Sequence, residues 1–158
     1  MSDCVSLQID QQVAIDKARL IRAVHIVLEQ QSETGCLSIV IQDSEAVAAL
    51  SRQHRGVNSP TDVLAFPAAN LPQEIAAKSR YLGDIVIALD YATARAAASG
   101  TDLGDILCLL VVHATLHLLG FVHGTVVERE IMWAAQGKAL RKLGIDAGLV
   151  TQYGGADV

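Results

Sequence analysis

Residues 83–100, GDIVIALDYATARAAASG, carry the clearest structural signal in the chain. Gly83 to Leu89 form an apolar run rich in β-branched side chains, which is typical of a β-strand. Asp90 then offers a helix cap, and the alanine-rich segment after it ends at Gly100, as helices commonly do. The stretch therefore predicts a strand that leads directly into a helix.

The same order of strand and helix occurs twice nearer the N-terminus. Apolar and polar residues alternate over 5–9, which predicts a strand, and a helical period follows over about 11–31 with Asp10 as its cap. Residues 37–41 predict a second strand and residues 45–54 a short helix. Strands that alternate with helices are typical of an α/β or α+β domain.

The rest of the chain predicts one short strand, a loop and two further helices. The strand covers 62–66 near a sheet edge, and the surface loop covers 67–81. An apolar helix is predicted from Thr101 or Asp102 to about Leu119. A last helix over 127–143 repeats apolar residues at every fourth position.

These elements predict a single domain over residues 1–158, a length suited to one hydrophobic core. The expected fold class is α/β (α+β), with a small mixed sheet of about four strands and four to five packed helices. We expect the tail after about residue 144 to be frayed.

Composition excludes several classes of protein. With 51% hydrophobic and 18% charged residues, the chain is globular rather than disordered. The net charge of −5 gives no overall attraction to nucleic acid or to an anionic membrane, so any phosphate site must be local. Aromatic residues make up only 4%, which argues against a platform for stacking bases.

The cysteines and the apolar segments bear on location. Cys4, Cys36 and Cys108 lie far apart without a CxxC pair, so we interpret them as buried thiols in a reducing compartment. The first residues lack the basic and apolar regions of a signal peptide. The longest apolar region, 106–122, contains two histidines and a glycine, which favours a core helix over a membrane span. The sequence thus predicts a cytoplasmic protein with no membrane partner.

Three of the five histidines fall within eleven residues, as His113, His117 and His123. Residues four apart on a helix have Cβ atoms about 5–6 Å apart, so the first two imidazoles can meet at one ion. Gly120 stands where a left-handed turn can bring His123 back to them. Three imidazoles leave the fourth position of a tetrahedral ion open, as in catalytic zinc sites.

The same eleven residues match the metzincin protease pattern H-E-x-x-H-x-x-G-x-x-H except at Ala114, which replaces the glutamate. That glutamate takes the proton from the metal-bound water, and alanine cannot do so. The substitution counts against peptide hydrolysis. His25 and His54 have no such partners in sequence and are interpreted as structural.

The histidine segment, with its Leu-Leu-Gly after His117, resembles the H-G-x-L-H-L-L-G-Y-D-H signature of the YbeY family of rRNA-maturation endoribonucleases. Arg55 with residues 59–67 resembles that family's Arg-x-x-(D)-x-P-T-[DN]-V-L-S-F-P segment, and residues 82–85 resemble its L-G-D-I strand. The match covers about residues 36–136. Ala114, Phe121, Val122 and Gln136 depart from it, standing in place of glycine, tyrosine, aspartate and glutamate.

The resemblance implies a single-strand-specific, metal-dependent endoribonuclease, a hydrolase of phosphodiester bonds that matures the 16S rRNA 3′ end and takes part in ribosome quality control. The metal ligands would be His113, His117 and His123, holding one divalent ion, with Zn²⁺ favoured, and His113 and Arg55 would be catalytic. Arg55 can pair with a phosphate and stabilise charge at phosphorus. The implied partners are single-stranded RNA, the small ribosomal subunit and its assembly factors.

Two alternatives from other classes stay open at this point. One is a metallopeptidase of the zincin type, and the other is a ribosome-associated binding factor with weak or no catalysis. Arg52, Lys78 and Arg80 could extend a local basic groove around the site. Asp62 and Asp84 are predicted as turn or cap residues, although either could orient a ligand histidine.

Overall fold

The computed structural model describes residues 4–9, 14–55, 62–68 and 80–149, without the side chains of Ser51, His54 and Arg55. Its elements in chain order are β1 (Cys4–Ile9), α1 (Lys17–Gln30), β2 (Cys36–Gln42), α2 (Ser44–Arg55), β3 (Val63–Pro67), β4 (Tyr81–Ala88), α4 (Leu89–Ser99), α5 (Leu103–Leu118) and α6 (Val126–Lys142). The four strands and the five-helix count of the described residues confirm the predicted fold class.

The strands form one mixed sheet in the order β1-β2-β4-β3. β1, β2 and β4 are parallel, and β3 pairs with β4 in the antiparallel direction at the edge, as predicted for residues 62–66. On β2, every second residue from Leu37 to Ile41 is buried, which gives this strand one core face.

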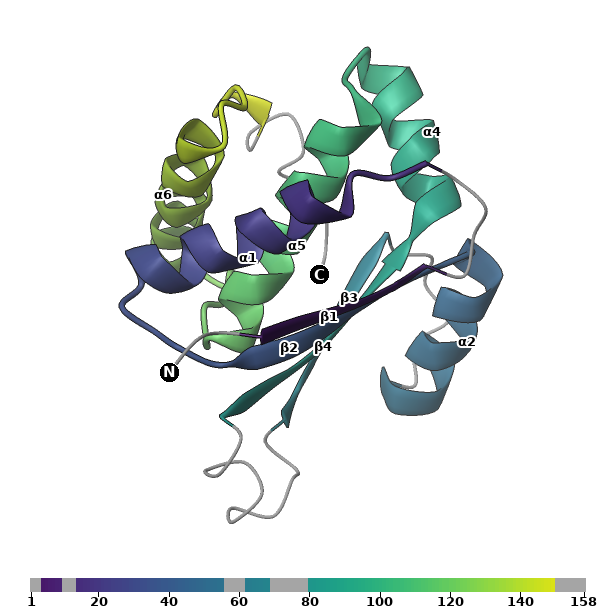
Figure 1. Ribbon diagram of the computed structural model, residues 1–158, viewed down its shortest axis with the longest axis horizontal. Coiled ribbons are helices and arrows are strands. Elements are labelled where there is room, and N and C mark those ends of the chain that lie inside the picture. The colour runs from purple at the N-terminus through teal and green to yellow at the C-terminus, as the bar shows by residue number, and fades with distance from the viewer. Residues whose placement is uncertain (1–3, 10–13, 56–61, 69–79, 150–158) are drawn as a thin grey trace.

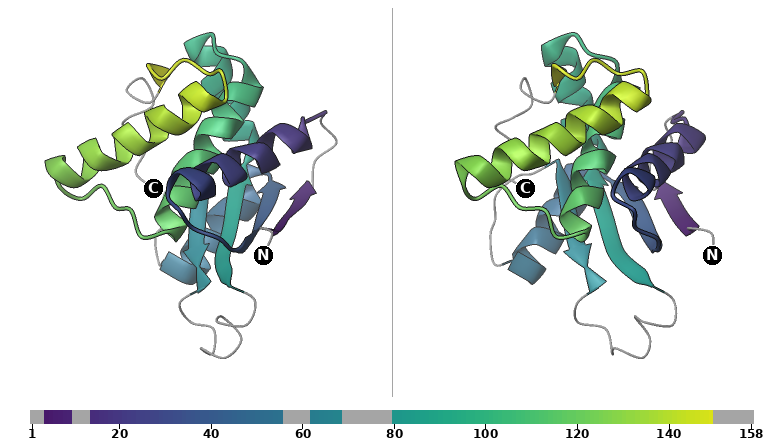
Figure 2. Two further views of the ribbon diagram at one scale, coloured as in Figure 1. Left: turned by 60° about the vertical axis from the view of Figure 1, so that its left-hand side comes forward. Right: turned by 90° about the vertical axis from the view of Figure 1, so that its left-hand side faces the viewer.

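Helices cover the two faces of the sheet unequally. α1, α4, α5 and α6 lie on one side, where they enclose the main hydrophobic core, while α2 lies on the other (Figure 1). A smaller apolar cluster packs α2 against the opposite face of the sheet, and it consists of Val47, Leu64, Val86 and Ala88. α5 passes through the middle of the larger layer between α1, α6 and the sheet (Figure 2). Packing against these elements therefore holds the C-terminal end of α5 in place.

Two helix starts differ from the sequence prediction. α1 begins at Lys17, and its cap is Asp16, whose Oδ1 accepts a hydrogen bond from the Arg19 backbone at 3.2 Å. Asp10 lies outside the described residues. α4 begins one residue before Asp90, so Ala88 holds the cap position and Asp90 lies in the first turn. There Asp90 accepts a hydrogen bond from Ser44 of α2, which ties the two helices together.

The interpretation of three free thiols is wrong for two of the cysteines. Cys4 and Cys36 are directly opposite one another on the paired strands β1 and β2, with Cα atoms 4.5 Å apart, and they form a disulfide. The pairing depends on the register of two strands, which no local pattern predicts. Cys108, in contrast, is a free buried cysteine, as expected.

The chain just beyond α6 is packed rather than frayed. Ile145 and Leu149 are both buried and belong to the main core, so residues 145–149 fold back onto the domain. Residues 150–158 lie outside the described residues. Within the described part of the chain, no helix has both the length and the apolar character that a membrane span needs.

Candidate metal centre

His113 and His117 lie on one face of α5, a helix that is apolar almost throughout. Their spacing of four residues places the imidazoles one above the other, and the two Nε2 atoms are 3.1 Å apart. The other residues of α5 from Ile106 to Leu118 are buried, so the helix backbone that carries both half-buried rings is fixed by packing.

Gly120 ends the helix and turns the chain. It adopts φ +102°, a conformation that other residues rarely take. The backbone N–H of Gly120 donates to His117 and that of Phe121 donates to Leu116, both at 3.0 Å, which is the Schellman pattern. The turn returns the chain to the end of α5, where His123 meets the other two histidines, as the sequence predicted.

The three imidazoles form a compact, half-buried cluster. Their ring centroids are 4.5, 5.0 and 5.6 Å apart, and one nitrogen from each lies within 4.8 Å of the others. Two ligands of a tetrahedral zinc ion, each at about 2.0–2.1 Å, are about 3.3 Å apart. The cluster of His113, His117 and His123 could therefore hold a metal ion.

The hydrogen bonds of the outer ring nitrogens indicate which nitrogen of each α5 histidine can act as a metal ligand. Nδ1 of His117 lies 2.9 Å from the backbone carbonyl oxygen of Phe121, so this nitrogen carries a proton and donates it. In a neutral His117 ring, Nε2 therefore carries a lone pair, and this lone pair points toward Nε2 of His113. Nδ1 of His113 is 2.6 Å from Oε1 of Gln136. Such outer hydrogen bonds are usual for zinc-ligating histidines, so the donor set fits a divalent cation.

α6 brings Gln136 to the cluster, a contact that sequence reasoning missed. A capping box starts the helix, in which the Thr125 side chain accepts from the Glu128 backbone and the Glu128 side chain accepts from the Thr125 backbone. Gln136 then lies in the buried stripe of α6 between Met132 and Leu140. The available signal was a polar residue among the apolar residues of one helix face, because a buried polar side chain needs a hydrogen-bond partner.

Comparison with known proteins identifies the family of this chain. The family model for "Endoribonuclease YbeY" matches residues 6–144. The chain belongs to the YbeY endoribonuclease family. It is 37% identical over 135 residues to Endoribonuclease YbeY of Azorhizobium caulinodans, covering 85% of this chain and 82% of that protein. It is 37% identical over 123 residues to that of Geobacillus kaustophilus, covering 75% and 79%.

A solved structure shares the fold. The solution structure of TM1509 from Thermotoga maritima superposes with a TM-score of 0.59 at 19% identity, covering 88% of each chain. At that identity the likeness concerns the fold alone. It agrees with the mixed four-stranded sheet found for this YbeY family member.

Arg55, the other predicted catalytic residue, is the last residue of α2, and its side chain lies outside the described residues. So do residues 56–61 of the family segment and Lys78. Arg80 forms an ion pair with Glu33 and donates to the Thr34 carbonyl oxygen at 3.0 Å.

The two aspartates that could have oriented a ligand histidine face elsewhere. Asp62 is buried and lies 3.5 Å from Arg95, and burial raises the pKa of its carboxyl against the opposing effect of that arginine. Asp84 accepts a hydrogen bond from the Tyr81 hydroxyl. Burial and this carboxylate both raise the pKa of Tyr81. The contacts described for both aspartates are therefore with the scaffold.

Position 114, where metzincins carry their glutamate, is fully buried in the main core. A carboxylate built there would lie among apolar side chains. Position 114 therefore supplies no general base, which agrees with the argument from sequence against a peptidase.

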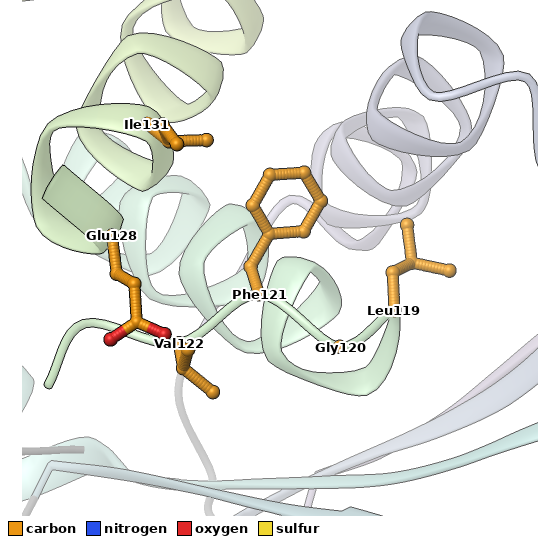
Figure 3. A pocket seen from close by; sticks show the side chains of 6 residues that line it. All are labelled: Leu119, Gly120, Phe121, Val122, Glu128 and Ile131. Carbon is orange, nitrogen blue, oxygen red and sulfur yellow. The ribbon is translucent and has the colours of Figure 1, made fainter.

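An open apolar pocket of about 290 Å³ lies between the turn after α5 and the first part of α6 (Figure 3). It is lined by Leu119, Gly120, Phe121, Val122, Glu128 and Ile131. Val122, directly before His123, is 51% exposed, and Ile131 across the pocket is 56% exposed. The first part of α6 thus leaves apolar side chains in solvent, although they continue the four-residue repeat of the helix. Glu128 is the one carboxylate in the lining, and one of its oxygens caps α6.

Proposed function

We propose that this protein is a metal-dependent endoribonuclease that cleaves single-stranded RNA at the cluster of His113, His117 and His123. The observation that carries the proposal is the convergence of three imidazoles from one helix and one turn in a member of the YbeY family. We assign one divalent cation to the cluster, with Zn²⁺ favoured, since three imidazoles suit that ion.

A bound divalent cation supplies Lewis acidity toward a phosphoryl oxygen and acidifies water at neutral pH. The protein's part is to hold three ring nitrogens deprotonated and convergent. The Phe121 carbonyl does this for His117 by accepting its Nδ1 proton, and α5 fixes the spacing of His113 and His117. Within the part of the chain that the structure describes, three protein ligands are offered, which leaves room for a substrate oxygen.

We assign to Arg55 the pairing with substrate phosphate, on the strength of its place in the family segment. The guanidinium fork binds two phosphate oxygens at once and would stabilise the charge that builds at phosphorus. Arg55→Lys keeps the charge and removes the fork, so RNA cleavage should fall while the thermal midpoint stays within about 1–2 °C of wild type. Equal losses of activity and stability would make Arg55 a structural residue.

The proposed substrate is rRNA at the 16S 3′ end, and the proposed partners are the small ribosomal subunit and its assembly factors. The proposed cellular location is the cytoplasm. In that compartment thiols are kept reduced, so the Cys4–Cys36 pair would be open there. Besides the disulfide, hydrogen bonds and apolar contacts join β1 to the rest of the sheet.

The decisive experiment offers metal-loaded protein two substrates. Incubation with single-stranded RNA and with casein, each with and without a chelator, separates nuclease, peptidase and non-catalytic binding protein. Chelator-sensitive RNA cleavage that is absent from His117→Ala supports the proposal. Chelator-sensitive proteolysis would replace it with the peptidase, and inertness on both substrates would leave a binding protein.

A further inference from the structure

A buried amide touches the metal cluster from behind its ligand atoms. Gln136 is only 3% exposed, and its Oε1 lies 2.6 Å from Nδ1 of His113. The other buried polar side chains of the described residues, Asp62 and Thr115, are satisfied by the scaffold, through an ion pair and a backbone carbonyl. Burying an amide is unfavourable unless it is hydrogen-bonded, and the partner of this one is a ligand histidine.

The amide and His113 can in principle meet in two ways. With the amide oxygen facing the ring, Nδ1 carries the proton and Nε2 presents a lone pair toward His117. With the amide nitrogen facing the ring, Nδ1 accepts, Nε2 carries the proton, and that proton reaches Nε2 of His117. The second arrangement places a proton on the nitrogen of His113 that would bind the cation.

Of the two histidines on α5, His113 has this choice and His117 does not. The Phe121 carbonyl can do nothing but accept, so it holds His117 in the form with the proton on Nδ1. The state of the pair therefore depends on which end of the Gln136 amide faces His113, and the structure has the oxygen there.

We propose that Gln136 is a positioning residue that selects the metal-ready tautomer of His113. It holds the ring by accepting the Nδ1 proton and keeps Nε2 unprotonated and directed at the cluster. Because glutamine is neutral, it does so without adding a negative charge beside the cation. This inference rests on the proposed metal site, and it concerns cation binding rather than RNA cleavage.

Two substitutions separate the hydrogen bond from the packing. Gln136→Met keeps the volume and removes the acceptor, so zinc affinity, measured by competition with a chromophoric chelator, should fall about 10–100-fold. Gln136→Glu restores an acceptor that cannot donate when ionised, so its zinc affinity should equal or exceed that of wild type. Gln30→Met is the matched control, because Gln30 also bonds α6, at the Lys138 carbonyl oxygen, away from the cluster. It should bind zinc as wild type does.

Nitrogen-15 NMR of the imidazoles gives a second readout that simple loss of packing would not move. In zinc-free wild type, His113 should carry its proton on Nδ1, and in Gln136→Met it should divide between the two nitrogens. Cobalt-loaded wild type and Gln136→Glu should share a tetrahedral visible spectrum, weakened in Gln136→Met at equal cobalt.

Three results would overturn the proposal. They are wild-type zinc affinity in folded Gln136→Met, weaker binding in Gln136→Glu than in wild type, and His113 protonated at Nε2 in the zinc-free wild type. The last two do not depend on the methionine variant folding. A wild type that binds zinc but leaves RNA intact would contradict the proposed function while leaving the role of Gln136 standing.

Discussion

Replacing Gly120 by alanine tests how the third histidine reaches the cluster. Gly120 has φ +102°, and a Cβ added to it would meet nothing within 4 Å, so the cost of alanine is conformational alone. For a residue other than glycine, a left-handed conformation costs about 1–2 kcal/mol. That free energy corresponds to about 5–30-fold in an equilibrium constant.

The cost must be borne either in folding or in metal binding. If the turn relaxes in the metal-free variant, His123 moves away and must return when the cation binds. We therefore expect Gly120→Ala to raise the zinc dissociation constant by about 5–30-fold, with a loss of folding stability below 1–2 kcal/mol. Chelator competition measures the first quantity and denaturant unfolding of metal-free protein the second.

Gly100 provides the matched control. It ends α4 with φ +65° in the same type of turn, and a Cβ there also meets nothing within 4 Å. Gly100→Ala should lose about 1–2 kcal/mol of stability, or about 2–8 °C in thermal midpoint, and bind zinc normally. Gly120→Asn should recover part of the affinity, since asparagine tolerates this conformation. If Gly120→Ala keeps both the zinc affinity and the folding stability of wild type, the left-handed turn carries no cost, and the reasoning fails.

Three further predictions concern the cysteines and position 114. In oxidised protein, Cys4→Ser should lower the free energy of unfolding by about 3.7 kcal/mol, the chain-entropy value for a separation of 32 residues, and it should have no effect after reduction; an equal loss in both states would contradict the cross-link. Burial raises the pKa of Cys108 to about 11, so at pH 8 about one thiol in a thousand is ionised, and iodoacetamide should label it only after unfolding. Ready labelling of native protein would show that the site is open. Ala114→Glu buries a carboxylate in the core, so it should lower the thermal midpoint and give no casein cleavage; a stable variant that cleaves casein would refute this placement.

The sequence predicted the elements better than their contacts. Apolar alternation located β1, whose alternate residues pack partly buried against the core, and an apolar run located β2, which buries one face. Both are local properties that the chain shows directly. The start of α1 was misplaced because its polar approach holds two aspartates that can cap, Asp10 and Asp16, and tertiary packing decides between them. The Cys4–Cys36 pair depends on the register of strands that are far apart in sequence, so local pattern could not reveal it.

The same division holds at the site. His113, His117 and Gly120 lie within one helix and its end, so their geometry follows from the spacing alone. The contact of Gln136 with His113 joins residues 23 apart through the packing of α6 on α5. That packing also leaves Val127, at the start of α6, 64% exposed although it belongs to the apolar repeat predicted for the helix. The buried stripe runs instead through Met132, Gln136 and Leu140. Which face of α6 is buried could therefore not be read from its pattern.

The metal content of protein purified without added ions tests the central claim most directly. Elemental analysis of wild type should find one divalent ion per chain. His117→Ala should have lost it, and His25→Ala, which changes a histidine of α1 outside the cluster, should retain it. Full stoichiometry in His117→Ala, or no ion in wild type even after incubation with zinc, would contradict the assignment of a cation to His113, His117 and His123.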